Sequence, residues 1–130
     1  MSLFKNIFGS SEEQTSVSKL NWITLTDLGQ LNEIIDLSHE KPVLIFKHST
    51  RCSISRFALK QFENEYDLDD KITLYFLDLL NHRDISNDIA SRFEVEHQSP
   101  QVLLIKEGKC IFNAAHSSID VQDLKQFLLL

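Results

Sequence analysis

The sequence contains little cysteine, proline, glycine or positive charge. Its 130 residues contain two cysteines, two prolines and three glycines, and 13 Lys and Arg face 19 Asp and Glu. Two cysteines are too few for the disulfide framework of a small secreted domain. The net charge of -6 argues against nucleic acid as a partner, because binding to phosphates depends on a basic face.

Long apolar runs are also missing. No stretch approaches the roughly 18 consecutive apolar residues of a transmembrane helix. The chain does not open with the charged, apolar and small-residue pattern of a secretory signal. We therefore expect a cytoplasmic protein without a transmembrane segment.

Apolar material is sufficient for one core, since 42% of the residues are hydrophobic and nine are phenylalanine. We expect one folded domain over residues 20–130. Residues 1–19 are rich in Ser, Glu, Gln and Thr without a sustained period, which predicts a flexible tail. Four large apolar residues of this tail recur at helical spacing and allow either a frayed terminus or a short docking turn: Leu3, Phe4, Ile7 and Phe8.

Short apolar runs with β-branched residues predict strands, several of them covered on both faces. These runs are "NWITL", "KPVLIF", "KITLYFLDL", "QVLLI" and "KCIFN". Gly108 supplies the turn of a hairpin between the last two. With helices between the strands and at the end, the predicted order is β-α-β-α-β-α-β-β-α.

Four helices are expected from apolar spacing and from residues that favour helix starts. The second spans Ser53 to Tyr66. The expected cap of the first helix is Thr26 or Asp27, and that of the last is Ser117 or Ser118. The third is expected to begin at Asp84 or Ser86. The expected inward stripe of the second helix is Ile54, Phe57, Ala58, Leu59 and Phe62.

Cys52 lies between a predicted strand and a predicted helix, in "FKHSTRCSIS". A free thiol has a pKa of about 8.5, and thiol exchange needs the thiolate. The amino end of a helix favours that anion, as do cations such as Arg51 and Arg56. Cys52 is therefore the candidate catalytic thiol.

Ser55 follows Cys52 by three residues on the same helix face, where its hydroxyl could donate a hydrogen bond to the thiolate. Serine forms no disulfide, so a resolving thiol must come from outside. His48 could line the site or simply be solvated. Cys110, inside a hairpin strand, is interpreted as structural, and no Cys and His spacing indicates a metal site.

The element order, with Cys52 at the second strand-to-helix junction and Pro100 before a hairpin strand, resembles the thioredoxin superfamily over residues 20–130. That resemblance implies an α/β fold with a central mixed sheet flanked by helices. The motifs "FKHSTRCSIS" and "SPQVLLIKEGK" resemble the monothiol bacilliredoxins of the bacillithiol system, the YtxJ-type proteins. Members of that family often carry proline after the cysteine, where this sequence has Ser53.

The resemblance implies a monothiol thiol-disulfide oxidoreductase that removes bacillithiol from S-bacillithiolated proteins through a Cys52 mixed disulfide. Bacillithiol would be the low-molecular-weight co-substrate, with no tightly bound cofactor. Ser99 and Pro100 would face the cysteine through a cis bond and contact the substrate, together with His48 and Arg56. Two alternatives are a thioredoxin-fold adaptor with an unreactive thiol and an iron–sulfur carrier that uses Cys52 and a small thiol.

Overall fold

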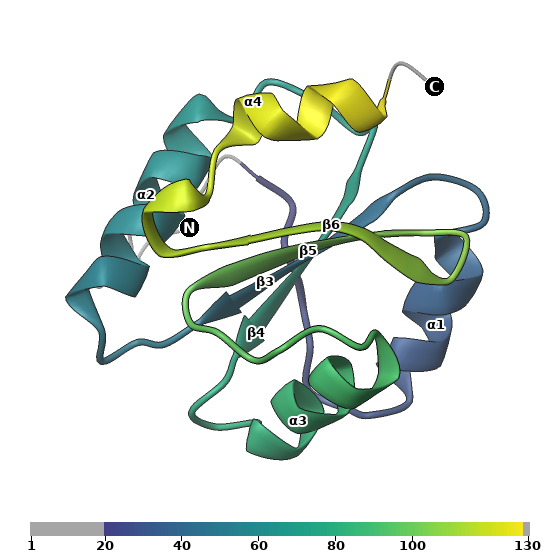
Figure 1. Ribbon diagram of the computed structural model, residues 1–130, viewed down its shortest axis with the longest axis horizontal. Helices are drawn as coiled ribbons and strands as arrows, with labels where there is room; N and C mark the ends of the chain where they lie inside the picture. Colours follow the sequence, from purple (N-terminus) through teal and green to yellow (C-terminus); the bar gives the residue numbers. More distant parts are fainter. Residues whose placement is uncertain (1–19, 129–130) are drawn as a thin grey trace, which may run out of the picture.

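The structure, a computed structural model, describes residues 20–128, so the tail predicted for residues 1–19 lies outside the described part. A five-stranded mixed sheet forms its centre, in the order β2-β4-β3-β5-β6 (Figure 1). The first three strands in this order are parallel, and β5 and β6 are antiparallel to their neighbours. The strands are β2 (Ile23–Thr24), β3 (Val43–His48), β4 (Thr73–Asp78), β5 (Gln101–Lys106) and β6 (Lys109–Ala115).

Helices cover both faces of the sheet, as Figure 1 shows. Helices α1 and α3 pack on one face, and α2 and α4 pack on the other. The helices are α1 (Gln30–Leu37), α2 (Ser53–Glu65), α3 (Arg83–Arg92) and α4 (Val121–Leu124), with 3-10 turns at His116–Ser118 and Lys125–Phe127. None of the helices within residues 20–128 has the length and apolarity needed to cross a membrane. The predicted order and the mixed sheet flanked by helices are confirmed.

Strand β3 is the centre of the core, and every one of its residues is buried. Successive side chains of a strand point to opposite faces. Val43 and Ile45 accordingly pack with α1 and α3, while Leu44 and Phe46 pack with α2 and α4. The continuous apolar run predicted this two-sided burial correctly.

Helix α1 begins later than predicted, because the chain first forms tight turns in which the carbonyl groups of Asp27 and Leu28 accept the N–H groups of Gln30 and Leu31. Neither Thr26 nor Asp27 is the N-cap; that position belongs to Gly29, which provides no side-chain cap. Instead the Oε1 atom of Gln30 accepts the backbone N–H groups of Thr26 and Asp27, at 2.8 and 3.0 Å. The longer glutamine side chain thus takes a role that short polar residues usually have at helix starts.

The starts predicted for the last two helices also differ from the observed ones. Helix α3 begins at Arg83, one residue before Asp84, and Ser86 lies inside it and is buried. The N-cap of α4 is Asp120, whose carboxylate accepts the N–H of Gln122 at 2.9 Å. The predicted cap at Ser117 or Ser118 is wrong because the chain forms a 3-10 turn there before α4 begins.

The predicted inward stripe of α2 is wrong at two positions. Ile54 and Phe57 are 57% and 70% exposed, whereas the buried residues of the helix are Ser55, Ala58 and Phe62. The inward face therefore contains a serine, and two large apolar residues are exposed. The spacing of apolar residues alone therefore does not predict which face of α2 is buried.

Leu103→Ala should lower the free energy of unfolding by about 2–5 kcal/mol, because Leu103 is fully buried in β5 and its truncation leaves a cavity. Leu28→Ala removes the same atoms from a residue that is 42% exposed, and should cost about 0.5 kcal/mol or less. Urea unfolding of both variants makes the comparison. Equal losses would contradict the placement of the core.

Candidate active site

Three segments meet at one edge of the sheet. Strand β3 ends there at His48, which pairs in register with Asp78 at the end of β4. Strand β5 starts at the same edge, since Gln101 pairs with Lys47. Cys52 comes shortly after the end of β3, and Pro100 directly precedes β5. The turn of residues 49–52, called the cysteine turn below, and the Ser99–Pro100 loop therefore extend from the same edge. The Ser99–Pro100 bond is cis, as predicted.

Cys52 is the N-cap residue of α2, with an extended backbone. Its N–H donates to the carbonyl of Ser49 at 3.2 Å, and its carbonyl accepts the N–H of Arg56 at 3.0 Å. The side chain is half-buried. At the amino end of a helix, backbone N–H groups without helical partners and the helix dipole both favour a negative charge. This position suits a thiolate nucleophile.

Both predicted cations lie beside this turn and are exposed. Arg51 directly precedes Cys52 in the chain. The guanidinium of Arg56 donates from Nη1 to the carbonyl of Thr50 at 3.0 Å, so it is held against the turn. Two exposed cations thus lie within four residues of Cys52 in a chain of net charge -6.

Ser55 and His48 contact each other on the buried side of the cysteine turn. The Oγ of Ser55 accepts the N–H of Ser49 at 3.0 Å and lies 2.8 Å from Nδ1 of His48. A hydroxyl has one proton and two lone pairs, so while it accepts the Ser49 N–H it can donate to Nδ1 in one tautomer of His48 and accept from Nδ1 in the other. Ser55 is fully buried and His48 is 5% exposed.

This pair gives Ser55 an observed structural role, since its hydroxyl connects the end of β3 to the first turn of α2. The sequence interpretation assigned that hydroxyl to the Cys52 thiolate, and this hydrogen bond stays a prediction. The substrate contact predicted for His48 also stays a prediction. The structure shows that Ser55 contacts both His48 and the backbone of Ser49, so the two side chains support the cysteine turn from its buried side.

The environment of His48 favours the neutral imidazole. Burial lowers its pKa, and the Arg56 cation lowers it further, while the carboxylates of Asp78 and Glu63 oppose that shift. The pKa is lowered overall. A neutral ring is the form that can accept the Ser55 proton at Nδ1.

Lys47 is a buried charged residue that the sequence interpretation missed. It lies on the opposite face of β3 from His48, is fully buried, and burial lowers its pKa to about 8. Its Nζ lies 3.4 Å from the carbonyl of Ser86 and 3.3 Å from Nδ1 of His97. The only sequence signal was a lysine directly after an apolar run, which usually marks the point where a strand reaches solvent.

Cys110 cannot serve as an internal partner for Cys52. It pairs with Ile105 near the hairpin turn, whereas Gln101 marks the site edge. Four residues of strand separate these positions by about 13 Å, and a disulfide needs Cα atoms within about 7 Å. The Cys110 thiol donates to the carbonyl of Phe112 at 3.3 Å, and burial raises its pKa.

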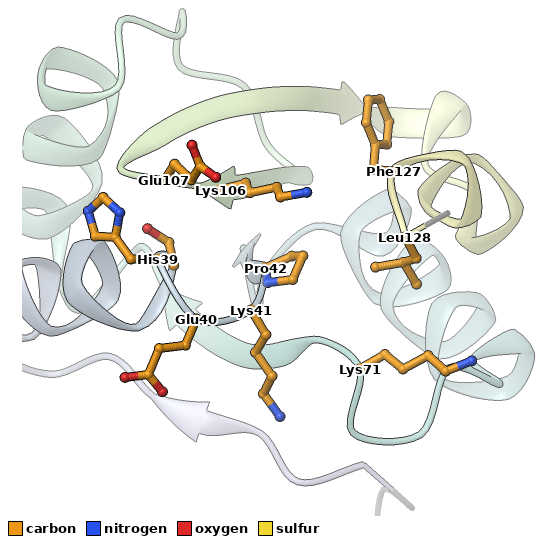
Figure 2. Close-up of a pocket in the computed structure, with 10 residues that line it drawn as sticks. His39, Glu40, Lys41, Pro42, Lys71, Lys106, Glu107, Phe127 and Leu128 are labelled. Carbon is orange, nitrogen blue, oxygen red and sulfur yellow. The ribbon is translucent and has the colours of Figure 1, made fainter. Parts of the chain in front are cut away.

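Two further features of residues 20–128 bear on the site. No group of three or more His, Cys, Asp or Glu in this part could hold a metal ion. A cavity of about 330 Å³ lies at the opposite edge of the sheet, where β3 begins and β5 ends (Figure 2). Pro42, Lys71, Lys106 and Phe127 are among its lining residues, and none of the predicted site residues lines it. The cysteine site is thus distinct from this cavity.

The fold, with Cys52 at the amino end of α2, is that of a thioredoxin-like redox protein. Residues 23–124 match the family described as monothiol bacilliredoxin BrxC. The chain belongs to this family, as the motifs around Cys52 and Pro100 predicted.

Solved structures support the same fold. One, described provisionally as an oxidoreductase with a thioredoxin fold, is 33% identical with a TM-score of 0.70, over 80% of this chain and 90% of the other. Thioredoxin from Malassezia sympodialis is 17% identical with a TM-score of 0.65, over 91% and 96%. Thioredoxin from Fasciola hepatica is 14% identical with a TM-score of 0.61, over 82% and 95%. The last two show similarity of fold alone.

The stability of the protein should fall as the pH drops below about 6.5, in part because of His48. Its pKa is lower in the folded protein than in the unfolded chain, so the unfolded chain binds more protons between the two values. The stabilisation is therefore complete above the unfolded pKa and decreases as the pH falls. His48→Phe should flatten this dependence, measured by urea unfolding from pH 7.5 to 5. Parallel curves for the two proteins would contradict the assignment.

Proposed function

We propose that this protein removes bacillithiol from S-bacillithiolated proteins through a mixed disulfide at Cys52. The observation that carries the proposal is a half-buried thiol at the amino end of α2, in a chain whose other cysteine is too distant to resolve it. Membership of the monothiol bacilliredoxin family supports the choice of small thiol. Bacillithiol acts as a co-substrate in this scheme.

The reaction consists of two thiol-disulfide exchanges. In the first, the Cys52 thiolate attacks the bacillithiol sulfur of the client disulfide, the Cys52–bacillithiol bond forms, and the client thiolate leaves and takes up a proton. In the second, the thiolate of another bacillithiol attacks the sulfur of the bound bacillithiol. Bacillithiol disulfide forms and the Cys52 thiolate is restored. Overall the client sulfur is reduced and the second bacillithiol is oxidised, while the first bacillithiol stays at the disulfide level throughout.

Arg51 and Arg56 suit the charge of this co-substrate. Bacillithiol carries carboxylates on its malate unit, and both arginines are exposed and close to Cys52 in the sequence. Exposed charges are screened by salt and act mainly on encounter. In this proposal the amino end of α2 provides most of the stabilisation of the thiolate. The arginines increase the rate of encounter with a disulfide that carries negative charge.

Cys52→Ala should abolish release of bacillithiol from a bacillithiolated client protein, because no other thiol lies at the site. Cys110→Ala is the matched control and should keep most of the activity. Client thiol appearing over time, with bacillithiol supplied as reductant, is the measurement. Release by the Cys52→Ala protein at the wild-type rate would refute the proposal.

The two alternative functions give different results in simple assays. An adaptor would have a Cys52 that is alkylated no faster than an ordinary thiol and would release no bacillithiol. An iron–sulfur carrier would be brown after anaerobic purification and would lose its cluster in Cys52→Ala. The proposed oxidoreductase would show client release without a cluster.

Arg51→Ala should slow the reaction of Cys52 with a bacillithiol disulfide more than with a neutral disulfide, and the difference should shrink in high salt. The measurement is the ratio of the two second-order rate constants at low and high salt, for wild type and variant. If both reactions slow equally, Arg51 acts on the thiol pKa instead. A ratio unchanged at both salts leaves Arg51 without a role in substrate choice.

A further inference from the structure

Lys47 is a buried cation whose described polar contacts are both with uncharged groups. Its side chain is fully buried on the face of the sheet that carries α1 and α3. Its Nζ contacts the carbonyl of Ser86 in α3 and Nδ1 of His97. The two ion pairs described for residues 20–128 involve Arg92 and Lys125. Lys47 is thus buried without a carboxylate partner among these residues.

Taking an ammonium group out of water is costly, and an apolar side chain of similar size is often as good or better at such a position. The carbonyl of Ser86 lies inside α3, where a helical hydrogen bond can satisfy it without Lys47. Stability therefore gives no reason for a lysine at this position, and the contact that its ammonium group makes with His97 becomes the feature to explain.

What it holds is the segment that leads to Pro100. Nδ1 of His97 lies 3.3 Å from the ammonium of Lys47 and 3.2 Å from the hydroxyl of Ser86. The loop is also connected internally, since the side-chain amide of Gln101 accepts the N–H of Gln98 and donates to the carbonyl of Glu96. His97 therefore joins this loop to β3 and to α3.

His97 is suited to accept the Lys47 ammonium. Partial burial lowers its pKa, and the cations of Lys47 and Arg83 lower it further. A neutral imidazole has one ring nitrogen that accepts, and here Nδ1 faces the ammonium. The contact is thus an ammonium donor with a neutral acceptor.

The segment held in this way lies at the edge of the sheet where Cys52 reacts. Gln101, next to Pro100, pairs with Lys47 itself, and Cys52 follows Lys47 by five residues. A client protein whose bacillithiol disulfide is attacked by Cys52 must therefore pass close to this loop. The hydroxyl of Ser99 is buried and has no hydrogen-bond partner among the described residues, so this loop has an unused polar group.

We propose that Lys47 is a positioning residue, which through His97 holds residues 97–100 in place to receive the client disulfide at Cys52. The inference rests on the function proposed above. It assigns to Lys47 no contact with the substrate and no part in the chemistry of the thiol. Its effect is on the affinity for the client.

The test compares Lys47→Met, which removes the donors but keeps an apolar chain, with Lys109→Met, an exposed lysine at the hairpin turn. Lys47→Met should raise KM for a bacillithiolated client protein about tenfold, since small misplacements of binding groups are costly, with little change in kcat. Alkylation of Cys52 by iodoacetamide should stay within about twofold of wild type. Thermal stability should be unchanged or higher. Lys109→Met should match wild type throughout.

His97 variants test whether Lys47 acts through this imidazole. His97→Leu should raise KM as Lys47→Met does, and His97→Gln, which keeps an acceptor, should restore part of the affinity. The double variant Lys47→Met/His97→Leu should be no worse than either single variant, because both changes break the same contact. Additive increases in KM would overturn the proposal.

The experiment distinguishes failure of the proposed function from failure of the role proposed for Lys47. A wild-type protein that releases no bacillithiol refutes the proposed function, and the inference with it. An active wild type with an unchanged KM in Lys47→Met refutes the inference alone. A Lys47→Met protein that loses stability while its KM is unchanged shows a purely structural lysine. Slower alkylation in proportion to the lost activity shows that Lys47 acts on the thiol, which also contradicts positioning.

Discussion

Strand β3 pairs along its length with β4 on one side and β5 on the other, and helices cover both of its faces. No side chain of this strand is exposed before the strand ends at His48. The turn that follows is thus the first point at which the central segment reaches solvent, and it holds Cys52 at the start of α2. The register that fixes β5 against β3 also fixes where the Ser99–Pro100 loop lies.

Two successive residues of β3 stabilise the two loops that flank the thiol. His48 faces α2 and bonds to Ser55, which fixes the cysteine turn. Lys47 faces α3 and contacts His97, which fixes the approach to Pro100. Because successive side chains alternate between the faces of a strand, a single strand end can support a loop on each side of the sheet. The polar dipeptide at the end of an apolar strand thereby links the core to the site.

The placement of the thiol has a chemical consequence. A dithiol enzyme closes its own disulfide, but here a buried serine occupies the position three residues after Cys52, and Cys110 lies near the far end of the hairpin. In the proposed reaction, release of the small thiol bound to Cys52 therefore requires a second thiol molecule. The exposed Ile54 and Phe57, close to Cys52 in α2, leave the surface beside the thiol partly apolar.

Much of this arrangement could be predicted from the sequence, because it depends on local patterns. The two-sided burial of β3, the hairpin around Gly108 and the place of Cys52 at a strand-to-helix junction all follow from short apolar runs and turn residues. The positive φ of Gly108 is the conformation that such a turn needs.

The remaining features depend on contacts between distant segments. Ser55 faces inward because His48 and Ser49 offer it partners, while Phe57 faces solvent, and apolar spacing alone indicates the reverse. The burial of Lys47 depends on α3 and His97, which lie 39 and 50 residues further along the chain. No local pattern carries that information.

The central claim is that Cys52 is the only thiol that exchanges and that it does so without an internal partner. Intact-mass measurement of the wild-type protein after incubation with oxidised bacillithiol, followed by peptide mapping, tests it most directly. The account predicts the mass of one bacillithiol adduct, located on Cys52, with Cys110 still reduced. A loss of two hydrogens, which marks a disulfide between Cys52 and Cys110, or an adduct on Cys110 would contradict it.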